Sequence, residues 1–387
     1  MRYMVAGVGR QGLSAVHDLV CNCEASEVLA VDARLTDDRC RNEVQAHVAK
    51  LLGDRAAVVH LQGADLAGQS ALDKLADEIR GFDCVISALP YALNGKLSQV
   101  AIAAGVPMCD MGGNPDMVDQ QQQLAATFNH ILVPECGLAP GIANVFIKYL
   151  HEHHGATHIQ AFCGGLPKEE PDPAANPLQY KLVFSPQGLI SEYMGECPVL
   201  DNGKVHYAAA LSGLERFDDD HEAFYTSNNS PRILEYFALI GIEQCRYKTL
   251  RYEGHLEKIR VLRSLGYLRR HDNTDPDLAQ RLADSAALKF DRASDEDKVI
   301  LAVRGSADGS APASIELVDH LDPETRFTAM ERTTAWGTTI VAYALAKGIC
   351  RPTNFATPEQ FIDTKWFIEQ LRRRTERITI KSPSAEG

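Results

Sequence analysis

The chain has 387 residues, of which 45% are hydrophobic and 24% are charged, and its formal net charge is -13. This composition and length are typical of a globular protein of two or three domains and exclude a disordered or fibrous one. An acidic surface repels nucleic acid and anionic lipid, so we expect neither as a partner. No stretch approaches the roughly eighteen unbroken apolar residues of a membrane span, so we expect no membrane contact either.

The cysteines and the start of the chain indicate the compartment. Ten cysteines are scattered along the sequence, and no C-x-x-C pair occurs among them. Cysteines without regular spacing act more often as small buried hydrophobes than as zinc ligands or disulfide partners. The N-terminus leads directly into an apolar run, with no charged leader or cleavage site. We therefore predict a cytoplasmic protein without a metal site.

Short apolar runs alternate with helix-like stretches over the first 135 residues. Strands are expected near 3–8, 28–31, 57–61, 84–89, 106–109 and 131–134. Helices, with apolar residues at helical spacing, are expected near 11–21, 69–80, 94–104 and 115–127. Because parallel neighbours need crossover connections, this alternation predicts a parallel sheet covered by helices on both faces. The predicted fold class is therefore α/β, with a doubly wound Rossmann domain at 1–135.

The pattern changes after Pro134, where mixed strands and helices predict an inserted α+β domain at 136–329. A loop is expected at the proline-rich stretch 168–177, and a hairpin turn at Asp201–Lys204. Further strands are expected at 247–252, 299–303 and 314–318, and helices near 141 and at 231–240, 255–265 and 276–289. A helix at 333–347, ended by Gly348, is expected to pack on the first domain. The Rossmann domain is therefore predicted to include about 330–376 as well as 1–135. The remainder, 377–387, is predicted to be a polar tail.

A glycine-rich stretch directly follows the first predicted strand and opens the first predicted helix. It is a G-x-G-x-x-G sequence formed by Gly7, Val8, Gly9, Arg10, Gln11 and Gly12. In this context the first glycine permits a tight turn, the second lets the backbone approach a pyrophosphate, and the third permits close packing of helix on strand. Free N–H groups at the helix start then bind the pyrophosphate. The stretch predicts a dinucleotide site, and a glycine turn that binds another ligand is the alternative.

An acidic residue stands where dinucleotide-binding domains require one. Asp32 lies twenty residues beyond Gly12, at the end of the next predicted strand. An aspartate there accepts hydrogen bonds from the adenosine ribose and repels a 2′-phosphate, so NAD is the predicted cofactor. Arg34 weakens this preference, and a solvated strand-end aspartate is the alternative. Because ligands bind beyond the carboxyl ends of parallel strands, further cofactor contacts are expected at Asp65, Leu89 and Pro90.

Four later stretches go beyond a generic nucleotide-binding enzyme. They are Pro134–Gly141, Cys163–Pro167, Asn176–Lys181 with Phe184-Ser185, and Leu250–His255 leading to Leu262–Gly266. In this order and spacing they resemble the saccharopine dehydrogenase-like family, which includes saccharopine reductases, carboxynorspermidine dehydrogenases and lysine 6-dehydrogenases. Arg332–Ala335 resembles the closing helix of that family. The resemblance covers about residues 1–350.

The resemblance implies a second domain that binds an amino-acid or diamine substrate over the nicotinamide and often mediates homodimerisation. All members interconvert a carbon–nitrogen bond and an imine. Saccharopine reductases usually carry aspartate where this chain has Ala139, and they place an arginine for an extra carboxylate in the loop matching 225–230, where this chain has none. Both departures favour a smaller substrate. The resemblance is therefore nearest to lysine 6-dehydrogenase, which oxidises the ε-amino group of lysine to allysine and releases ammonia.

Such an enzyme has to hold a substrate carboxylate. Gly164 and Gly165, expected to follow a strand, offer backbone N–H groups for this, with Lys181 or Arg251 as the charge partner. A plain Gly-Gly turn is the alternative interpretation.

The enzyme also has to deprotonate an ammonium group with an ordinary pKa of about 10.4. His255 and Asp110 are the candidate catalytic residues, because histidine titrates near neutrality and Asp110 is expected at a strand end in the crevice. As alternatives, His255 caps the helix that follows it and Asp110 anchors the glycine turn. The His151–His154 cluster lacks H-E-x-x-H spacing and is predicted to be a polar helix end.

Two other functions remain open from the sequence. A saccharopine or carboxynorspermidine reductase would use the same chemistry in the reductive direction on a larger amine. A non-catalytic regulatory protein would bind NAD without turning over any amine.

Overall fold

The computed structural model describes residues 1–66, 68–112, 115–227, 230–268, 281–282, 284–307 and 311–382. The chain forms two compact units. The first consists of Met1–Val145 and Glu331–Glu376, and the second of Phe146–Met330 and Arg377–Gly387. The first boundary lies inside a helix, α6 (Ala143–His154), rather than at residue 135 as the sequence pattern predicts.

A six-stranded parallel sheet forms the centre of the first unit, with strand order β3-β2-β1-β4-β5-β6. The strands are β1 (Arg2–Ala6), β2 (Glu27–Asp32), β3 (Val59–Gly63), β4 (Cys84–Ser87), β5 (Met108–Asp110) and β6 (Leu132–Val133). Each lies within a few residues of its predicted position. The doubly wound Rossmann fold predicted from the sequence is confirmed.

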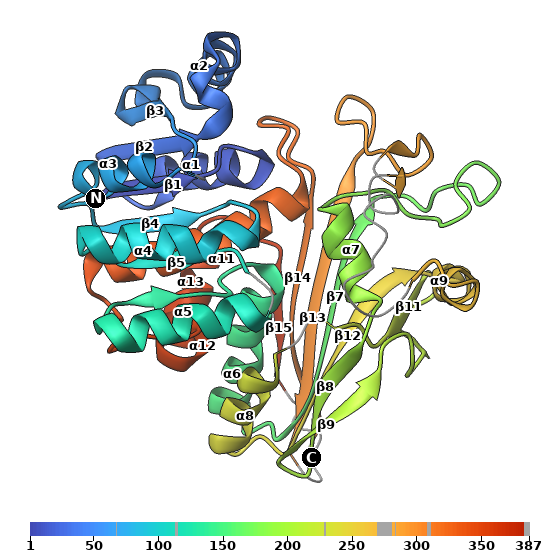
Figure 1. The fold of residues 1–387 in the computed structure, drawn as a ribbon. Coiled ribbons are helices and arrows are strands. Elements are labelled where there is room, and N and C mark those ends of the chain that lie inside the picture. The colour runs from blue at the N-terminus through green and yellow to red at the C-terminus, as the bar shows by residue number, and fades with distance from the viewer. Residues whose placement is uncertain are drawn as a thin grey trace. The chain divides into compact units, whose positions relative to one another are not determined.

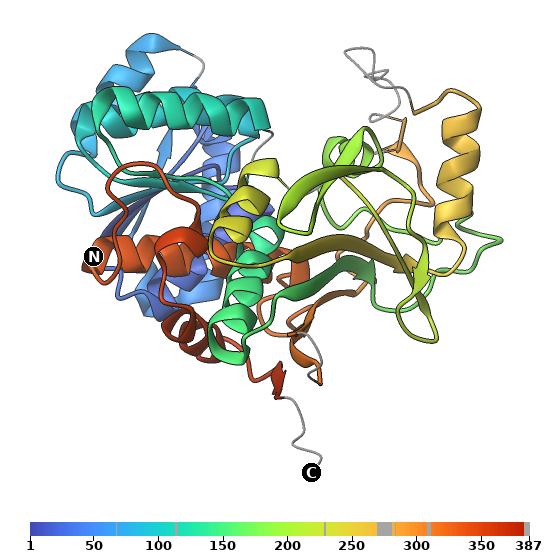
Figure 2. The same ribbon diagram turned by 90° about the horizontal axis from the view of Figure 1, so that it is seen from below.

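Helices cover both faces of this sheet, as Figures 1 and 2 show. On one face lie α3 (Gln69–Glu78), α4 (Asn94–Ala104) and α5 (Pro115–Phe128), and on the other lie α1 (Arg10–Asn22) and α11 (Ala329–Lys347). The middles of β1 and β2 are apolar, and all four residues of β4 are buried. A parallel sheet needs such continuous apolar runs because neither of its faces meets water.

The helix between β2 and β3 is not predicted by the sequence pattern. It is α2 (Asp38–Leu52), which follows the short turn η1 (Ala33–Thr36) and buries only Val48 and Leu52. A nearly all-polar helix carries little apolar periodicity, so the pattern that reveals its neighbours is absent. Its start is fixed locally, because the Asp37 carboxylate accepts the Cys40 N–H at 2.8 Å.

The remaining elements of the first unit lie in its returning segment. They are α12 (Pro358–Phe361), α13 (Thr364–Arg372) and the part of α11 from Glu331 onward. The predicted helix at 333–347 is confirmed, and Gly348 ends it with a φ of 66°. Thr338 and Thr339 on α11 bond to Cys136 and Asp18, so this helix packs on the first unit as expected.

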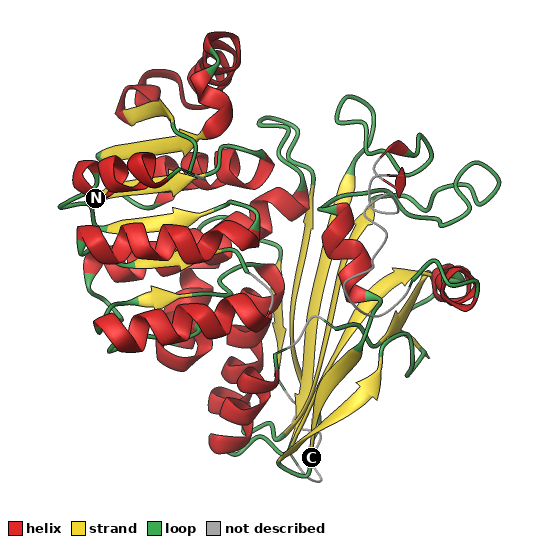
Figure 3. Cartoon of the chain, in the orientation of Figure 1, coloured by secondary structure: helices red, strands yellow, loops and turns green. Residues whose placement is uncertain are grey.

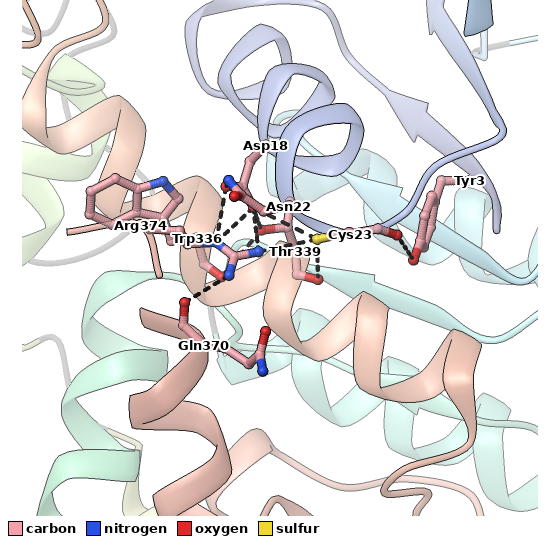
Figure 4. Close-up of polar contacts among 8 residues, drawn as sticks. All are labelled: Tyr3, Asp18, Asn22, Cys23, Trp336, Thr339, Gln370 and Arg374. Atoms are coloured by element: carbon pink, nitrogen blue, oxygen red, sulfur yellow. Dashed lines mark hydrogen bonds and ion pairs between the residues drawn. The ribbon is translucent and has the colours of Figure 1, made fainter. Parts of the chain in front are cut away.

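A buried ionic network joins this segment to α1 (Figure 4). The Arg374 guanidinium donates to the Asp18 carboxylate, at 2.9 Å from Nε and 2.8 Å from Nη2, and it also lies 3.1 Å from Cys23 Sγ. The Arg374 and Asp18 side chains are only 1% and 3% exposed. Asn22 and Thr339 donate to the same carboxylate. Hydrogen bonds within the protein therefore replace the hydration of this aspartate.

A mixed sheet forms the second unit (Figure 3). Its strand order is β10-β11-β12-β7-β13-β14-β15, and β8 pairs with β12 and β9. Among the described strands of this sheet, only β12 and β7 run parallel, and the other pairs are antiparallel. The strands are β7 (His158–Pro167), β8 (Glu196–Asp201), β9 (Lys204–Ala209), β10 (Glu215–Arg216), β11 (His221–Phe224), β12 (Gln244–Tyr252), β13 (Asp297–Ser306), β14 (Ala313–His320) and β15 (Ile378–Lys381).

Several second-unit predictions can be compared with the structure. The hairpin turn at Asp201–Lys204 is confirmed, because it joins β8 to β9. The helices at 231–240 and 255–265 are confirmed as α8 (Pro231–Leu239) and α9 (His255–Ser264), and α7 (Pro186–Glu192) is additional. Of the helix expected at 276–289, residues 276–280 and 283 lie outside the described residues, and 285–289 form a turn rather than a helix, so the prediction is wrong for that part. The polar tail is wrong in part, because Ile378–Lys381 forms β15 on β14.

Candidate nucleotide-binding and substrate-binding sites

The glycine turn is tight at Gly7 and Gly12 and open at Gly9. Gly7 has a φ of 93°, and a Cβ on Gly12 would lie 1.8 Å from the Gly7 carbonyl oxygen. A Cβ on Gly9, by contrast, would meet no atom within 4 Å. Gly7 therefore makes the turn, Gly12 lets the helix approach, and Gly9 leaves its side of the loop open.

The first turn of α1 follows this loop directly. Gly9 is the N-cap of α1, and no acidic residue lies in the first turn. The positive end of the helix dipole is therefore not offset from within the helix. Val8 is buried, whereas the Arg10 side chain is 48% exposed and lies 4.0 Å from the Glu331 carboxylate.

Asp32 lies beside the glycine turn. Its carboxylate accepts the Val8 N–H at 2.9 Å and the Arg34 N–H at 2.9 Å, and the Arg34 guanidinium donates to it as well. Although partial burial opposes ionisation, these hydrogen bonds lower the pKa of Asp32 below its ordinary value. The carboxylate is thus ionised and 13% exposed, next to the loop that would hold a dinucleotide.

The neighbouring strand ends meet at the same edge of the sheet. A Cβ on Gly7 would lie 2.7 Å from the Ala88 carbonyl oxygen, so the turn after β1 touches the segment that leads into Leu89 and Pro90. At the end of β3, the Ala64 N–H donates to the Asp32 carbonyl, and Asp65 follows it on the surface. The structure therefore brings all the predicted cofactor residues to one edge.

Asp110 ends β5 but is turned into the protein. It is 1% exposed, and its carboxylate accepts hydrogen bonds from Gly112 N at 2.9 Å, Gln121 Nε2 at 2.8 Å and Glu135 N at 3.2 Å. Burial raises the pKa of Asp110 although these donors oppose the rise. This geometry favours the alternative role, in which Asp110 anchors the turns after β5 and β6.

In the second unit, Arg251 and His255 belong to one buried chain of hydrogen bonds. The Arg251 guanidinium pairs with the Glu192 carboxylate at 3.0 Å and donates through Nε to the Tyr193 hydroxyl at 2.9 Å. The same hydroxyl lies 2.9 Å from His255 Nε2, while His255 Nδ1 lies 2.7 Å from the Leu178 carbonyl oxygen. Because a carbonyl only accepts, Nδ1 carries the proton, and Nε2 accepts from Tyr193.

His255 is held neutral in this chain. Burial, followed by the charge of Arg251, lowers the pKa of His255 to about 3. Both ring nitrogens are also engaged in hydrogen bonds. In this structure His255 starts α9 and links it to α7, so its predicted proton-handling role would require Tyr193 to move.

The predicted carboxylate cradle is not present as such. Gly164 and Gly165 lie inside β7, paired with Ile300 and Val299 of β13, so neither the expected position after a strand nor the alternative turn is correct. Their small size serves packing instead: a Cβ on Gly164 would lie 2.8 Å from Leu250 Cβ. Lys181 Nζ lies 2.5 Å from Asp295 Oδ1 in an ion pair.

Sequence reasoning does not find Glu192 and Tyr193. They lie at the end of α7 and reach Arg251 across 59 and 58 residues of chain. No local spacing connects them to the Leu250–His255 stretch. The close packing of the Tyr180 and Tyr193 rings around the Arg251 guanidinium, at 4.9 and 5.8 Å, is likewise a tertiary contact.

The histidine cluster at 151–154 lies at a helix end, as predicted, and the cysteines are unpaired. His151 lies near two backbone carbonyls, 2.9 Å from Ala156 O and 2.9 Å from Ile240 O. Its helix ends at His154, and Gly155 follows with a φ of 65°. All ten cysteines are free. Among the described residues, no cluster of potential metal ligands occurs, and no helix has the length and hydropathy of a transmembrane span.

Comparison with known sequences gives a consistent result. The family model of the saccharopine dehydrogenase C-terminal domain matches residues 137–376. The chain is 28% identical over 219 residues to the saccharopine dehydrogenase (NADP(+), L-glutamate-forming) of Schizosaccharomyces pombe, covering 53% of this chain and 47% of that protein. It is 26% identical over 210 residues to mitochondrial alpha-aminoadipic semialdehyde synthase of Rattus norvegicus, covering 51% and 22%. The chain thus spans less than half the length of these two relatives.

Solved structures share the fold. The apo saccharopine dehydrogenase (L-Glu forming) of Saccharomyces cerevisiae superimposes with a TM-score of 0.73 at 17% identity, covering 98% of this chain and 100% of that one. The homospermidine synthase of Legionella pneumophila, solved in complex with NAD, gives 0.66 at 11% identity, covering 100% and 93%. At these identities the likeness concerns the fold alone.

Proposed function

The chain belongs to the saccharopine dehydrogenase family, and on that premise we propose that it is a nicotinamide-dependent oxidoreductase acting on a carbon–nitrogen bond of an amino acid or diamine. The relatives named as saccharopine dehydrogenases support this reaction class. The open glycine turn and the ionised Asp32 beside it support a dinucleotide cofactor.

We propose NAD as that cofactor. The Asp32 carboxylate is held at the glycine turn by the Val8 N–H, where it can accept the ribose hydroxyls and repel a 2′-phosphate. Arg34 could favour a phosphate, but its guanidinium is engaged by Asp32 and by the Val8 carbonyl. The S. pombe relative is named for NADP(+), so the preference of this chain needs a direct test.

For the substrate we propose L-lysine, oxidised at its ε-amino group to allysine with release of ammonia. One observation carries this choice. The two cations predicted to bind the substrate carboxylate are already in ion pairs, Arg251 with Glu192 and Lys181 with Asp295. A cation already neutralised by the chain is a poor partner for the additional carboxylates of a larger substrate. Ala139 and the uncharged sequence at 225–230 support the same choice.

When bound, the nicotinamide supplies the hydride acceptor, and the chain positions the reactants. The start of α1 holds the pyrophosphate and Asp32 holds the ribose. In the second unit, the hydrogen-bonded chain from Glu192 through Arg251 and Tyr193 to His255 fixes α7, β12 and α9 together. We propose that this network is a positioning device, because its charges are buried and compensated.

A second candidate is oxidation of saccharopine, which the names of the relatives favour. The two candidates separate in one assay. The purified chain is mixed with NAD or NADP and with lysine, saccharopine or carboxynorspermidine, and reduced nucleotide is followed by its absorbance. We expect turnover with lysine and NAD, with ammonia formed in equal amount. Saccharopine turnover without lysine turnover would overturn the substrate proposal, and NAD binding without any turnover would indicate a regulatory protein.

A further inference from the structure

A half-open pocket lies on the sheet of the second unit, away from the hydrogen-bonded chain around Arg251. Its volume is about 290 Å³. The polar side chains of its lining come from three adjacent strands: His158, Gln160, Gln244, Arg246, Arg304 and Ser306. Two arginines thus share one small pocket in a chain whose net charge is -13.

Strand register explains why these side chains meet. Gln160 on β7 is paired with Arg246 on β12 and with Arg304 on β13, so the three form one row across the sheet. His158 is paired in the same way with Gln244 and Ser306, which makes a second row. The rows are two residues apart, and side chains two apart in a strand point to the same face. The pocket is therefore a block of polar side chains on one face of the sheet.

The cations of the pocket are available. Among the described residues, Arg304 makes no hydrogen bond or ion pair, and its guanidinium stacks on Phe217 and Phe162, at 4.6 and 5.4 Å from the ring centroids. Arg246 lies 3.9 Å from Asp201, with both side chains 40% exposed. An exposed pair at this distance is weak and is readily replaced by a competing anion. Stacking holds the Arg304 fork in place while leaving its N–H groups open.

Acidic residues lie near the pocket but are not part of its lining. Glu243 lies 3.9 Å from His158 Nε2, at the outer row. Lys248, next along β12, is paired with Glu215 at 3.1 Å and donates to the Gly213 carbonyl at 2.7 Å. The acidic groups therefore lie beside His158, Arg246 and Lys248, and within the described parts of the chain no carboxylate forms an ion pair with Arg304.

We propose that this pocket is a binding site for a small oxyanion, of the carboxylate or phosphate class, held between Arg246 and Arg304 with the Gln160 amide between them. Two strand spacings separate the arginine Cα atoms, or roughly 10 Å, so guanidinium groups from both sides can reach one ligand. Guanidinium groups bind carboxylates and phosphates through paired, charge-assisted hydrogen bonds.

The site is separate from the candidate substrate site. Along β7, Gly165 lies five residues beyond Gln160, and along β12, Arg251 lies five residues beyond Arg246. At about 3.3 Å per residue this is roughly 17 Å on both strands. The proposal therefore does not rest on the proposed function.

Arginine side-chain NMR tests the site directly. The full chain is labelled with ¹⁵N-arginine, and the Nε–Hε signals of Arg246 and Arg304 are assigned from Arg246→Lys and Arg304→Lys spectra. Inorganic phosphate and glutarate are titrated separately at constant ionic strength. We expect both signals to shift together with at least one probe. The tighter probe identifies the ligand as a phosphate or a dicarboxylate.

Substituting the arginines shows whether the oxyanion binds in this pocket. In Arg304→Gln, the titration of the Arg246 signal should require roughly tenfold more ligand or worse, since one charge-assisted contact is lost. Arg373→Gln, an equal change of charge at an exposed position on the other unit, should have no effect. The proposal is overturned if neither signal moves, if chloride moves them equally, or if Arg304→Gln leaves the Arg246 titration unchanged.

Discussion

Single side chains of this protein should contribute most to the free energy of unfolding where they bear a buried charge. The Asp18 carboxylate accepts four kinds of donor, from Arg374, Thr339, Asn22 and Cys23. A buried ion pair is tolerated only when its remaining lone pairs are satisfied in this way. Removing one partner leaves the other charge buried without compensation.

Arg374→Ala should therefore lower the free energy of unfolding by about 3–5 kcal/mol, the usual consequence of breaking a buried pair. The chemical-denaturation midpoint of the first unit measures this. Arg373→Ala, one residue earlier and exposed, should change stability by less than about 0.5 kcal/mol. Equal stability of the two variants would contradict the buried pair.

His255 predicts a specific response to acid. The folded-state pKa of His255, about 3, is below the ordinary value of 6.5. Above pH 6.5 the histidine is neutral in both states, so the free energy of unfolding has its full value there. As the pH falls from 6.5 towards 3, the unfolded state gains a proton that the folded state does not, and stability drops by up to about 1.4 kcal/mol per pH unit. His255→Gln should remove this component from the pH profile, whereas His60→Gln, on the exposed side of β3, should retain it.

Asp32 is the residue that most directly tests the cofactor assignment. Asp32→Ala removes the acceptor for the ribose and for the Val8 N–H. Loss of hydrogen bonds to a charged group is worth about 1.5–3 kcal/mol, so NAD affinity should fall roughly 10- to 100-fold. Preference over NADP should fall as well, because Arg34 is released. Calorimetry with both nucleotides measures this, with the exposed Asp54→Ala as control.

At the scale of elements, β1 and α1 meet at a glycine turn whose backbone atoms lie too close together to admit a side chain at Gly7 or Gly12. Gly12→Ala would bring a Cβ to 1.8 Å from the Gly7 carbonyl oxygen, so the helix has to move. We expect a loss of about 1–3 kcal/mol of stability together with weaker NAD binding. Gly9→Ala meets no neighbour and has an ordinary φ of -73°. It should fold normally and lose NAD affinity alone, and unchanged affinity would show that the pyrophosphate does not approach Gly9.

The sequence is informative about elements whose signal is local. Buried strands such as β4 appear as apolar runs, and the glycine turn is marked by three glycines and one aspartate in a short span. The polar helix α2 has no such signal. In the second unit, Gly164 and Gly165 look like a turn locally, but their place is set by pairing with β13, which lies more than a hundred residues later. Arg251 looks available for a substrate because its partner Glu192 is 59 residues away.

For the molecule as a whole, the order of the chain matters. The chain leaves the first unit at Val145, returns at Glu331 and enters the second unit again at Arg377. The last entry supplies β15, which pairs with β14 from Ser314 to Leu317. Arg377 also forms an ion pair at 3.3 Å with Asp319, which is fully buried. The second unit is therefore completed by a segment that follows the whole of the first.

A chain shortened to end at residue 376 should retain NAD binding, because all the candidate cofactor residues lie in the first unit. The second unit should be destabilised, since β14 loses its outer partner and Asp319 loses its ion pair with Arg377. Hydrogen exchange of β14 should rise while that of β1 stays unchanged. A chain ending at residue 382 keeps β15 and should behave as the full chain does. Equal protection of β14 in both would contradict the role of β15.

The late pairing of β15 affects the protein during synthesis. Ile315 finds its partner, Ile380, only after all the residues between them have been translated. Until then the outer edge of β14 presents unpaired N–H and C=O groups, and such an edge is a template for another nascent strand. Neighbouring ribosomes on one message would bring several of these edges together, so aggregation in crowded expression should respond to translation rate and to chaperones that cover strand edges.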